Sequence, residues 1–412
     1  MDLLSVLPVV QEQVLSRGIP VPGWRDTETE HRRFASAVAQ VLTELRLATG
    51  LPPGEAAKVL ARAMTGIGVL QPLLGQDGVE EVIVRNGFVQ VERRGVIENV
   101  GSLAPDSHFE QVARRAADLG QRMLKGDRPY VLVDLPDGSR FTAIIPPLSR
   151  RGTAINIRVF ARTALSLNDL ARFRTFEPMP DAPPDAPEED LTTGPEPDML
   201  PPVARFLRAV AERNAATVLV SGEFGAGKTT LLNAISRYIP DDVQLAVVET
   251  FEELKIAHPH PLRVVVPEGR EGNFPTMDEV LNIVVTRMRP DLLVVGEIVR
   301  DEAPRFLDAI NLGKKAWSTI HGNDALGALY RLETKALVSG LPHTAIREQI
   351  AAGVDLIVHM RKYRGRRYVA EVARVEGLDT EGYYRLRYLY RTGWGGDDLQ
   401  FLTKELGELE CA

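Results

Sequence analysis

The sequence predicts an α/β protein in which a domain with a mainly parallel sheet follows an α+β N-terminal domain. Two patterns predict this class. From Pro201 onward, segments of helical periodicity alternate with short apolar runs, which is typical of a parallel sheet covered by helices. Residues 79–160 instead show alternating strand patterns, one helical segment and an Asp137-Gly138 dipeptide that favours a tight hairpin turn.

Length and composition place the chain among multidomain globular proteins. Its 412 residues exceed one ordinary core, so two or three domains are expected. Hydrophobic residues make up 44% and charged residues 25%, as in ordinary globular proteins. The formal net charge of −7 argues against a protein that coats nucleic acid through bulk charge, although a local basic groove remains compatible with it.

Cysteine content and hydropathy bear on the compartment. Cys411 is the single cysteine, so no internal disulfide forms and a reducing cytoplasm is expected. No run of 18 apolar residues occurs, and the Met1-Asp2 start lacks a basic segment, so neither a transmembrane helix nor a signal peptide is expected. Attachment to a membrane would then depend on partner proteins.

The N-terminal half divides into three predicted segments. Residues 1–60 form a helical region, in which an apolar stripe of Phe34, Val38, Val41 and Leu42 recurs at helical spacing. Residues 61–165 form the α+β domain, with strands within 79–100, a helix at 107–124 and strands within 128–160. Residues 166–200 form a linker, because Asp181–Asp198 is rich in Pro, Asp and Glu and lacks Lys and Arg. A functional acidic tail is the alternative for this segment.

Residues 201–412 form the predicted parallel-sheet domain with a C-terminal extension. Thr276–Glu279 is a capping box that begins one helix, and Gly313 follows the end of the next. Helices are predicted at 203–213, 229–238, 277–288, 302–312, 324–338 and 343–354, and strands at 216–221, 243–249, 262–267, 291–297, 316–320 and within 355–391.

Gly222 to Thr229 read Gly-Glu-Phe-Gly-Ala-Gly-Lys-Thr, which is a complete phosphate-binding loop, or P-loop. It lies between an apolar strand and a helix, so its backbone N–H groups and the helix N-terminus are placed to surround phosphates. Lys228 is expected to reach the β- and γ-phosphates and Thr229 to ligate Mg²⁺. ATP and Mg²⁺ are therefore the predicted cofactors. The predicted nucleotide-binding residues are Gly222, Glu223, Phe224, Gly225, Ala226, Gly227, Lys228, Thr229 and Thr230.

Polar residues end three further predicted strands. Glu297 ends the apolar run that starts at Leu292, and Glu249 ends the run before it. His321 follows the strand at 316–320. Since the carboxyl ends of parallel strands meet at one sheet edge, these residues are expected near the P-loop. Glu297 is the predicted catalytic carboxylate and His321 a γ-phosphate sensor. Lys228 and Glu249 are also predicted to be catalytic, and Glu249 and Glu297 are candidate Mg²⁺ ligands. A surface glutamate and a packing histidine are the structural alternatives.

These motifs resemble those of the secretion ATPases of the type II/type IV superfamily, nearest the branch that powers tight-adherence (Tad) pili. The similarity runs from about Gly68 to Gly377 and covers most of the chain. The matching motifs are the Walker A at Gly222–Thr229, the acidic box with Glu249 and Glu253, the Walker B at Arg289–Glu297, the histidine box at Thr319–Asn323, the N-terminal-domain segments Leu135–Arg140 and Ile155–Arg158, and the C-terminal helix segment Ala345–Ile350.

The resemblance implies a hexameric motor with a RecA-like P-loop NTPase domain. In the family, ATP lies between the two domains, and arginines of the first domain reach the nucleotide. The resemblance gives this role to Arg140 and Arg158, which as residues alone would be read as solvated strand positions. It also implies ATP hydrolysis for pilus assembly or protein secretion, a cytoplasmic position at the inner face of the membrane, a homohexamer, contacts with inner-membrane platform proteins, and no stable nucleic-acid binding.

Three departures separate this chain from the family pattern. Thr250 follows Glu249 where an aspartate is usual, Lys314 follows Gly313 where a histidine is usual, and Glu223-Phe224 replaces a common Gly-Thr. The first two changes are expected to remove polar groups near the phosphates, which predicts an active but slow ATPase.

Two alternative functions follow from particular residues. Thr250 and Lys314 motivate a nucleotide-gated ring that hydrolyses little ATP. The basic segment Arg361–Tyr368, together with related rings that serve conjugation, motivates a DNA-transfer motor. An ordinary charged hairpin turn around Gly365 is the structural interpretation of the same segment.

Overall fold

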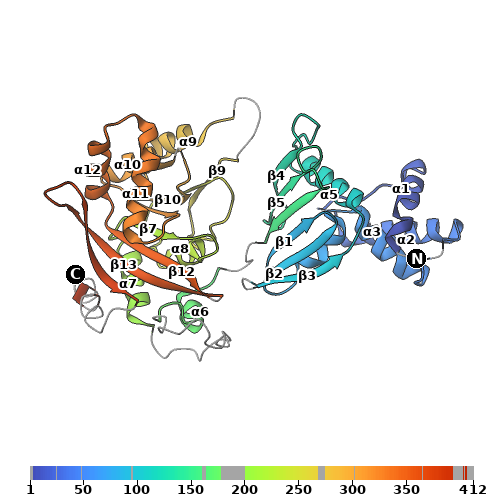
Figure 1. Cartoon of the computed structure of the whole chain (residues 1–412), viewed down its shortest axis with the longest axis horizontal. Helices are drawn as coiled ribbons and strands as arrows, with labels where there is room; N and C mark the ends of the chain where they lie inside the picture. Colours follow the sequence, from blue (N-terminus) through green and yellow to red (C-terminus); the bar gives the residue numbers. More distant parts are fainter. Residues whose placement is uncertain are drawn as a thin grey trace. The chain divides into compact units, whose positions relative to one another are not determined.

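The computed structural model describes residues 3–24, 26–47, 49–93, 96–159, 164–177, 200–267, 274–300, 302–363, 365–392, 402 and 404–405. The chain divides into two compact units, Met1–Ala161 and Arg162–Ala412, and each has its own hydrophobic core (Figure 1). The predicted acidic segment Asp181–Asp198 and Cys411 lie outside the described residues.

The first unit is built on a six-stranded antiparallel sheet with the order β3-β2-β1-β6-β5-β4. The predicted hairpin is confirmed, since Gly138 has a φ of +86° in the turn between β4 and β5, a conformation that favours glycine. The strands are β1 (Val79–Arg85), β2 (Phe88–Arg93), β3 (Val96–Ser102), β4 (Tyr130–Asp134), β5 (Arg140–Ile144) and β6 (Ala154–Arg158).

Helices of the first unit share one core with this sheet. The predicted stripe of Phe34, Val38, Val41 and Leu42 is buried on α2, and it belongs to the same cluster as the inward side chains of β1 and β5. The two segments that the sequence analysis separates at residue 60 are therefore continuous. The helices are α1 (Leu7–Ser16), α2 (Glu28–Glu44), α3 (Pro53–Met64), α4 (Gln71–Leu74) and α5 (Asp106–Leu119), with short 3₁₀ segments at Leu3–Val6 and Gly68–Leu70.

The second unit is built on an eight-stranded sheet with the order β14-β13-β12-β7-β11-β10-β8-β9. The strands from β12 to β9 in this order are parallel, whereas β13 and β14 are antiparallel additions at one edge. The mainly parallel sheet is confirmed. The strands are β7 (Val218–Gly222), β8 (Leu245–Glu249), β9 (Leu262–Val265), β10 (Leu292–Glu297), β11 (Lys315–Ile320), β12 (Leu356–Tyr363), β13 (Arg366–Leu378) and β14 (Tyr384–Arg391).

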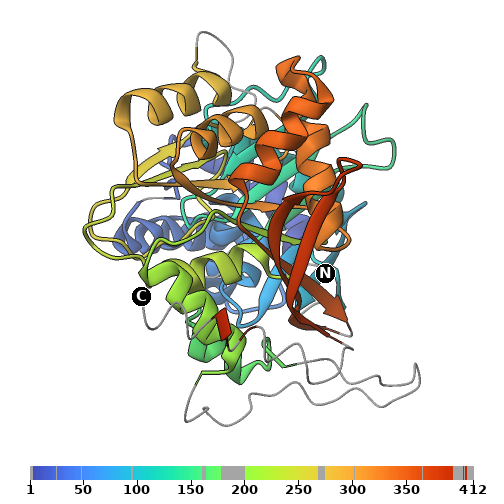
Figure 2. The ribbon, with the colours of Figure 1, turned by 90° about the vertical axis from the view of Figure 1, so that its left-hand side faces the viewer.

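Helices cover both faces of this sheet (Figures 1 and 2), so alternate residues of a central strand enter different cores. Val218 and Val220 of β7 pack with α6, α7 and α8, whereas Leu219 packs with α9 to α12 on the other face. None of the helices in the described ranges is long and apolar enough to cross a membrane. The helices are α6 (Leu167–Arg172), α7 (Pro202–Glu212), α8 (Lys228–Ser236), α9 (Met277–Ile283), α10 (Glu302–Asn311), α11 (Ala325–Ala336) and α12 (His343–Gly353), with a 3₁₀ segment at Leu337–Ser339.

The start of the predicted linker is folded. Residues 166–200 were assigned to the linker by composition, but Ser166 caps α6, and Leu167 and Leu170 enter the core shared with α7 and α8. The prediction is wrong for this part because a helix of six residues is too short to show a period, while its few apolar side chains suffice to attach it to the core.

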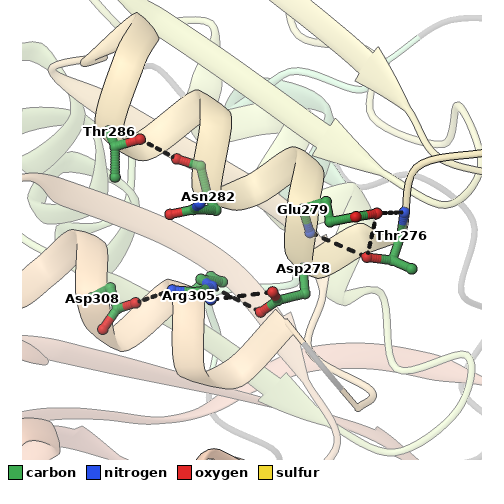
Figure 3. A network of polar contacts seen from close by, with 7 residues as sticks. All are labelled: Thr276, Asp278, Glu279, Asn282, Thr286, Arg305 and Asp308. Atoms are coloured by element: carbon green, nitrogen blue, oxygen red, sulfur yellow. Dashed lines mark hydrogen bonds and ion pairs between the residues drawn. The ribbon is translucent and has the colours of Figure 1, made fainter.

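Helix α9 begins where the capping box predicts. The Thr276 hydroxyl accepts the backbone N–H of Glu279, and the Glu279 carboxylate accepts the N–H of Thr276 (Figure 3). Arg305 of α10 donates to Asp278 of α9, and this contact joins the two helices. Arg305 also donates to Asp308 of its own helix. The predicted helix 277–288 continues only as a π-helical turn over Val284–Met288 and ends at Arg289, whose φ is +51° before Pro290.

Candidate active site

Four neighbouring parallel strands end at one edge of the second sheet. They are β7, β11, β10 and β8, in that spatial order. The P-loop follows β7, His321 follows β11, and Glu297 and Glu249 end β10 and β8. The expected convergence of these residues therefore follows from the strand order, and β11 places His321 between the P-loop and Glu297.

Two glycines shape the P-loop, one by a close approach and one by its backbone conformation. A Cβ atom at Gly222 would lie 2.4 Å from the Met360 carbonyl oxygen of β12, so no larger residue fits there. Gly227 precedes α8 with a φ of +92°, which turns the chain so that the helix begins at Lys228. The loop thus presents its backbone N–H groups at a helix N-terminus, where phosphate binds favourably.

The other predicted nucleotide-binding residues lie around this turn. Ala226 is buried, whereas Thr229 and Thr230 are half-buried in the first turn of α8. The Glu223 carboxylate accepts the backbone N–H of Lys362 on β12 at 3.4 Å. The Phe224 ring is 78% exposed.

Lys228 is buried within the loop. Its Nζ donates to the carbonyl oxygens of Gly222 at 3.1 Å and Glu223 at 3.0 Å, and it lies 3.3 Å from Nδ1 of His321. An ammonium group at this place can bond to phosphate oxygens in the same loop, which is the role that the motif predicts.

His321 contacts Lys228 and Glu297 with opposite sides of its ring. Nδ1 also lies 3.2 Å from the Gly222 carbonyl, while Nε2 lies 2.9 Å from Oε1 of Glu297. One ring nitrogen therefore faces the lysine, and the other faces the carboxylate. One imidazole therefore connects the phosphate-binding lysine to the predicted catalytic carboxylate.

Glu249 is buried and bonded to the turn that follows its own strand. Its Oε1 accepts the backbone N–H groups of Leu254 at 2.8 Å and Glu253 at 3.1 Å. Burial raises the pKa of this carboxyl to about 7, although both N–H groups favour the charged form. A Cβ atom at Gly296 would lie 3.1 Å from Cγ of Glu249, so glycine at 296 leaves the space that the Glu249 side chain occupies.

The predicted Mg²⁺ ligands do not form a closed metal site. Within the described ranges, no three Asp, Glu, His or Cys side chains cluster closely enough to hold a metal ion. The Thr229 hydroxyl and the Glu297 carboxylate would offer hard oxygen ligands to Mg²⁺, because this ion usually takes a few protein oxygens together with nucleotide phosphates and water. The hydrogen bonds of Glu249 reach neither residue.

Arg140 and Arg158 belong to the first unit and lie directly opposite each other on β5 and β6. Arg140 also pairs with Asp134 across β4, and Arg158 pairs with Glu81 across β1. These four residues form a row on one face of the sheet, because their neighbours Phe141 and Ile157 point into the core. The two guanidinium groups therefore share one surface of the first unit.

Lys314 lies at the other end of the sheet. It precedes β11 and is 3.9 Å from Asp291 before β10, whereas His321 follows the opposite end of β11. A strand of this length separates its two ends by about 20 Å. The expectation that Lys314 replaces a polar group near the phosphates is therefore wrong. Lys314 and the histidine box at Thr319–Asn323 lie at opposite ends of β11, which spacing in the sequence does not reveal.

The sequence analysis missed two contacts that β12 and β13 make with the P-loop. Arg367 Nε donates to the Gly225 carbonyl at 2.7 Å. His359 is buried on β12, and its Nδ1 lies 2.8 Å from Oγ of Ser221, the residue before the loop. The charged hairpin around Gly365 is confirmed, and one of its basic side chains, Arg367, also bonds to the P-loop. The Arg361–Tyr368 segment was the signal that pointed here.

Comparisons with known proteins find similar sequences and similar structures. The sequence model of the family described as Type II/IV secretion system protein matches residues 196–379. A putative conjugal transfer protein of Mycobacterium tuberculosis is 30% identical over 330 residues, or 77% of this chain and 86% of that protein. The type IV secretion system protein PtlH of Bordetella pertussis is 30% identical over 331 residues, or 75% of this chain and 94% of that protein.

Similar solved structures include the VirB11 ATPase from the Brucella suis type IV secretion system in complex with sulphate. It is 24% identical and has a TM-score of 0.37, with 74% of this chain and 91% of that chain covered.

Proposed function

Because this chain belongs to the type II/IV secretion system protein family, we propose that its ATP hydrolysis drives macromolecular transfer through a conjugation-type, type IV secretion machine. The chain is a P-loop ATPase of this family. The observation that carries the catalytic part of the proposal is the contact chain from Lys228 through His321 to Glu297.

The names of the relatives support the choice of machine. One is a putative conjugal transfer protein and the other a type IV secretion system protein, and this chain covers 86% and 94% of their lengths. These names favour the DNA-transfer alternative over the pilus assembly that the motifs suggest. Assembly of a tight-adherence pilus, or protein secretion, is the second candidate, and it is favoured by the order of motifs from Leu135 to Ile350.

The site residues divide the chemistry among them. Lys228 and the loop N–H groups hold the phosphates, and the Thr229 hydroxyl offers an oxygen to Mg²⁺, which when bound neutralises phosphate charge. Glu297 orients the attacking water, and His321 registers the γ-phosphate through its contact with Lys228. Arg140 and Arg158 contribute cationic charge to the nucleotide phosphates. The working form is a homohexamer in the cytoplasm, in contact with inner-membrane platform proteins.

Phosphate release from ATP tests the assignment of the site. Wild-type protein should release phosphate, and Lys228→Ala and Glu297→Gln should each lower the rate by at least about 10²-fold. Nucleotide binding should survive in Glu297→Gln and weaken in Lys228→Ala. Equal rates in wild type and Glu297→Gln would show that Glu297 is not the catalytic carboxylate. Tight binding of ATP without turnover would instead favour the nucleotide-gated ring.

The ATPase rate in the presence of DNA tests the choice of machine. A conjugation-type motor that handles DNA should be stimulated at low salt, with stimulation that falls as salt rises. The matched control is a neutral polymer of similar length. Absence of any response to DNA at low salt would favour the pilus-assembly candidate, in which the cargo is protein.

A further inference from the structure

Phe224 is a large apolar side chain on the exposed surface of the P-loop. It is 78% exposed, so core packing does not account for it. Its ring packs against that of His321 in a tilted arrangement, with 4.1 Å between the ring centroids and 40° between the planes. The Lys228 ammonium lies 6.0 Å from the centre of the same ring, at the outer limit of a cation–π contact.

The orientation of His321 matters because both ring nitrogens are used. Nδ1 lies near Lys228 and the Gly222 carbonyl, and Nε2 lies 2.9 Å from Glu297. A tilt of the imidazole would lengthen contacts on both sides at once. An aromatic ring packed 4.1 Å away, centroid to centroid, opposes that tilt, because the imidazole could not turn toward it without a clash.

We propose that Phe224 is a positioning residue that holds the His321 ring between Lys228 and Glu297. The proposal deepens the function proposed above and rests on the roles given there to His321 and Glu297. Phe224 also belongs to the loop that surrounds the phosphates, so its ring links the conformation of that loop to the His321–Glu297 contact. An aliphatic side chain at 224 keeps the loop but loses the aromatic ring.

Steady-state kinetics of Phe224 variants test the role in catalysis. Phe224→Ala and Phe224→Leu should lower kcat by about three- to tenfold while KM for ATP changes by less than about twofold. Phe224→Tyr should restore kcat to near the wild-type value, since it retains the ring. Phe88→Ala is the matched control, because Phe88 is also exposed, at 62%, and belongs to the first unit. It should leave both constants unchanged.

Chemical labelling tests the contact without relying on activity. Diethylpyrocarbonate modifies accessible neutral histidines, and peptide mass spectrometry reports the rate at each one. His321 should be labelled several times faster in Phe224→Ala than in wild type or Phe224→Tyr. The exposed His260 serves as the internal reference. The comparison of Phe224→Ala with wild type and Phe224→Tyr leaves Glu297 unchanged, so the labelling result does not depend on which residue is the catalytic carboxylate.

Each combination of outcomes supports or overturns the proposal. Faster labelling with a lower kcat, both reversed by tyrosine, supports it. Unchanged labelling of His321 in Phe224→Ala overturns it whatever the rates, as does a kcat equal to that of wild type. A rise in KM alone would assign Phe224 to nucleotide binding and would also overturn it.

Discussion

His321 Nε2 lies 2.9 Å from Oε1 of Glu297, and this contact joins the ends of two adjacent parallel strands, β11 and β10. Because β11 also neighbours β7, the same imidazole reaches the lysine of the P-loop. A change at Lys228 can therefore reach Glu297, the proposed catalytic carboxylate, through one side chain. The strand order produces this relationship, since neither residue is near the other in sequence.

A double-mutant cycle on this pair should reveal strong coupling. His321→Ala is expected to lower kcat by about 10- to 100-fold, since it removes the side chain that contacts Glu297 and is the proposed γ-phosphate sensor. His321→Ala combined with Glu297→Gln should be little slower than Glu297→Gln alone. His260→Ala is the control and should keep the wild-type rate. Fully additive losses in the double variant would mean that the two residues act independently.

Gly296→Ala should destabilise the second unit through Glu249. The new Cβ would lie 3.1 Å from Cγ and 3.4 Å from Oε1 of the Glu249 side chain. The carboxylate would have to move away from the N–H groups of Leu254 and Glu253, at a cost of about 1–3 kcal/mol in the free energy of unfolding. Urea denaturation measures this loss. Gly54→Ala, with no atom within 4 Å of the new Cβ, should cost nothing. Equal stability of both variants would contradict the steric argument.

Arg367→Ala should raise KM for ATP about three- to tenfold with a smaller effect on kcat. Arg367 Nε donates to the Gly225 carbonyl, and loss of this bond lets the loop leave the conformation that presents its N–H groups. The control is Arg385→Ala, because Arg385 lies exposed on β14. If Arg367 instead contacts only DNA, its replacement should abolish the stimulation of the ATPase rate by DNA. The KM for ATP in the absence of DNA should then stay unchanged.

Local patterns predicted the parts of this protein that depend on neighbouring residues. The P-loop, the capping box at Thr276 and the strand ends at Glu249 and Glu297 each follow from a few adjacent residues and from the rule that parallel strands end together. The sheet order follows from packing over the whole unit. Ser221 and His359 are 138 residues apart, so their contact depends on β12 pairing with β7, which no local pattern specifies.

The errors have the same physical origin. Lys314 was expected near the phosphates because it departs from the family pattern that also includes His321, but β11 carries the two residues to opposite ends of the sheet. The linker was begun at residue 166 because composition changes nearby, but a short helix needs only a few apolar contacts to dock. In both cases the direction or attachment of an element decided the outcome, and residue type did not.

Acid should destabilise the second unit through His359. Burial lowers the pKa of this imidazole to about 4 from an ordinary value of 6.5, and Arg361 and Lys228 nearby act in the same direction against the opposing effect of Asp324. Between pH 6.5 and 4 the unfolded chain binds a proton that the folded chain does not, so stability falls as the pH falls. Above pH 6.5 both states are neutral, and His359 contributes no pH dependence. The loss should approach about 3 kcal/mol at pH 4.

Urea denaturation at pH 7.5, 6.5, 5.5 and 4.5 measures this loss. The slope of the free energy of unfolding against pH is compared between wild type and His359→Gln, whose amide can still bond to Ser221. His260→Gln should retain the wild-type slope, and a slope in His359→Gln equal to that of wild type would show that His359 titrates normally in the folded protein.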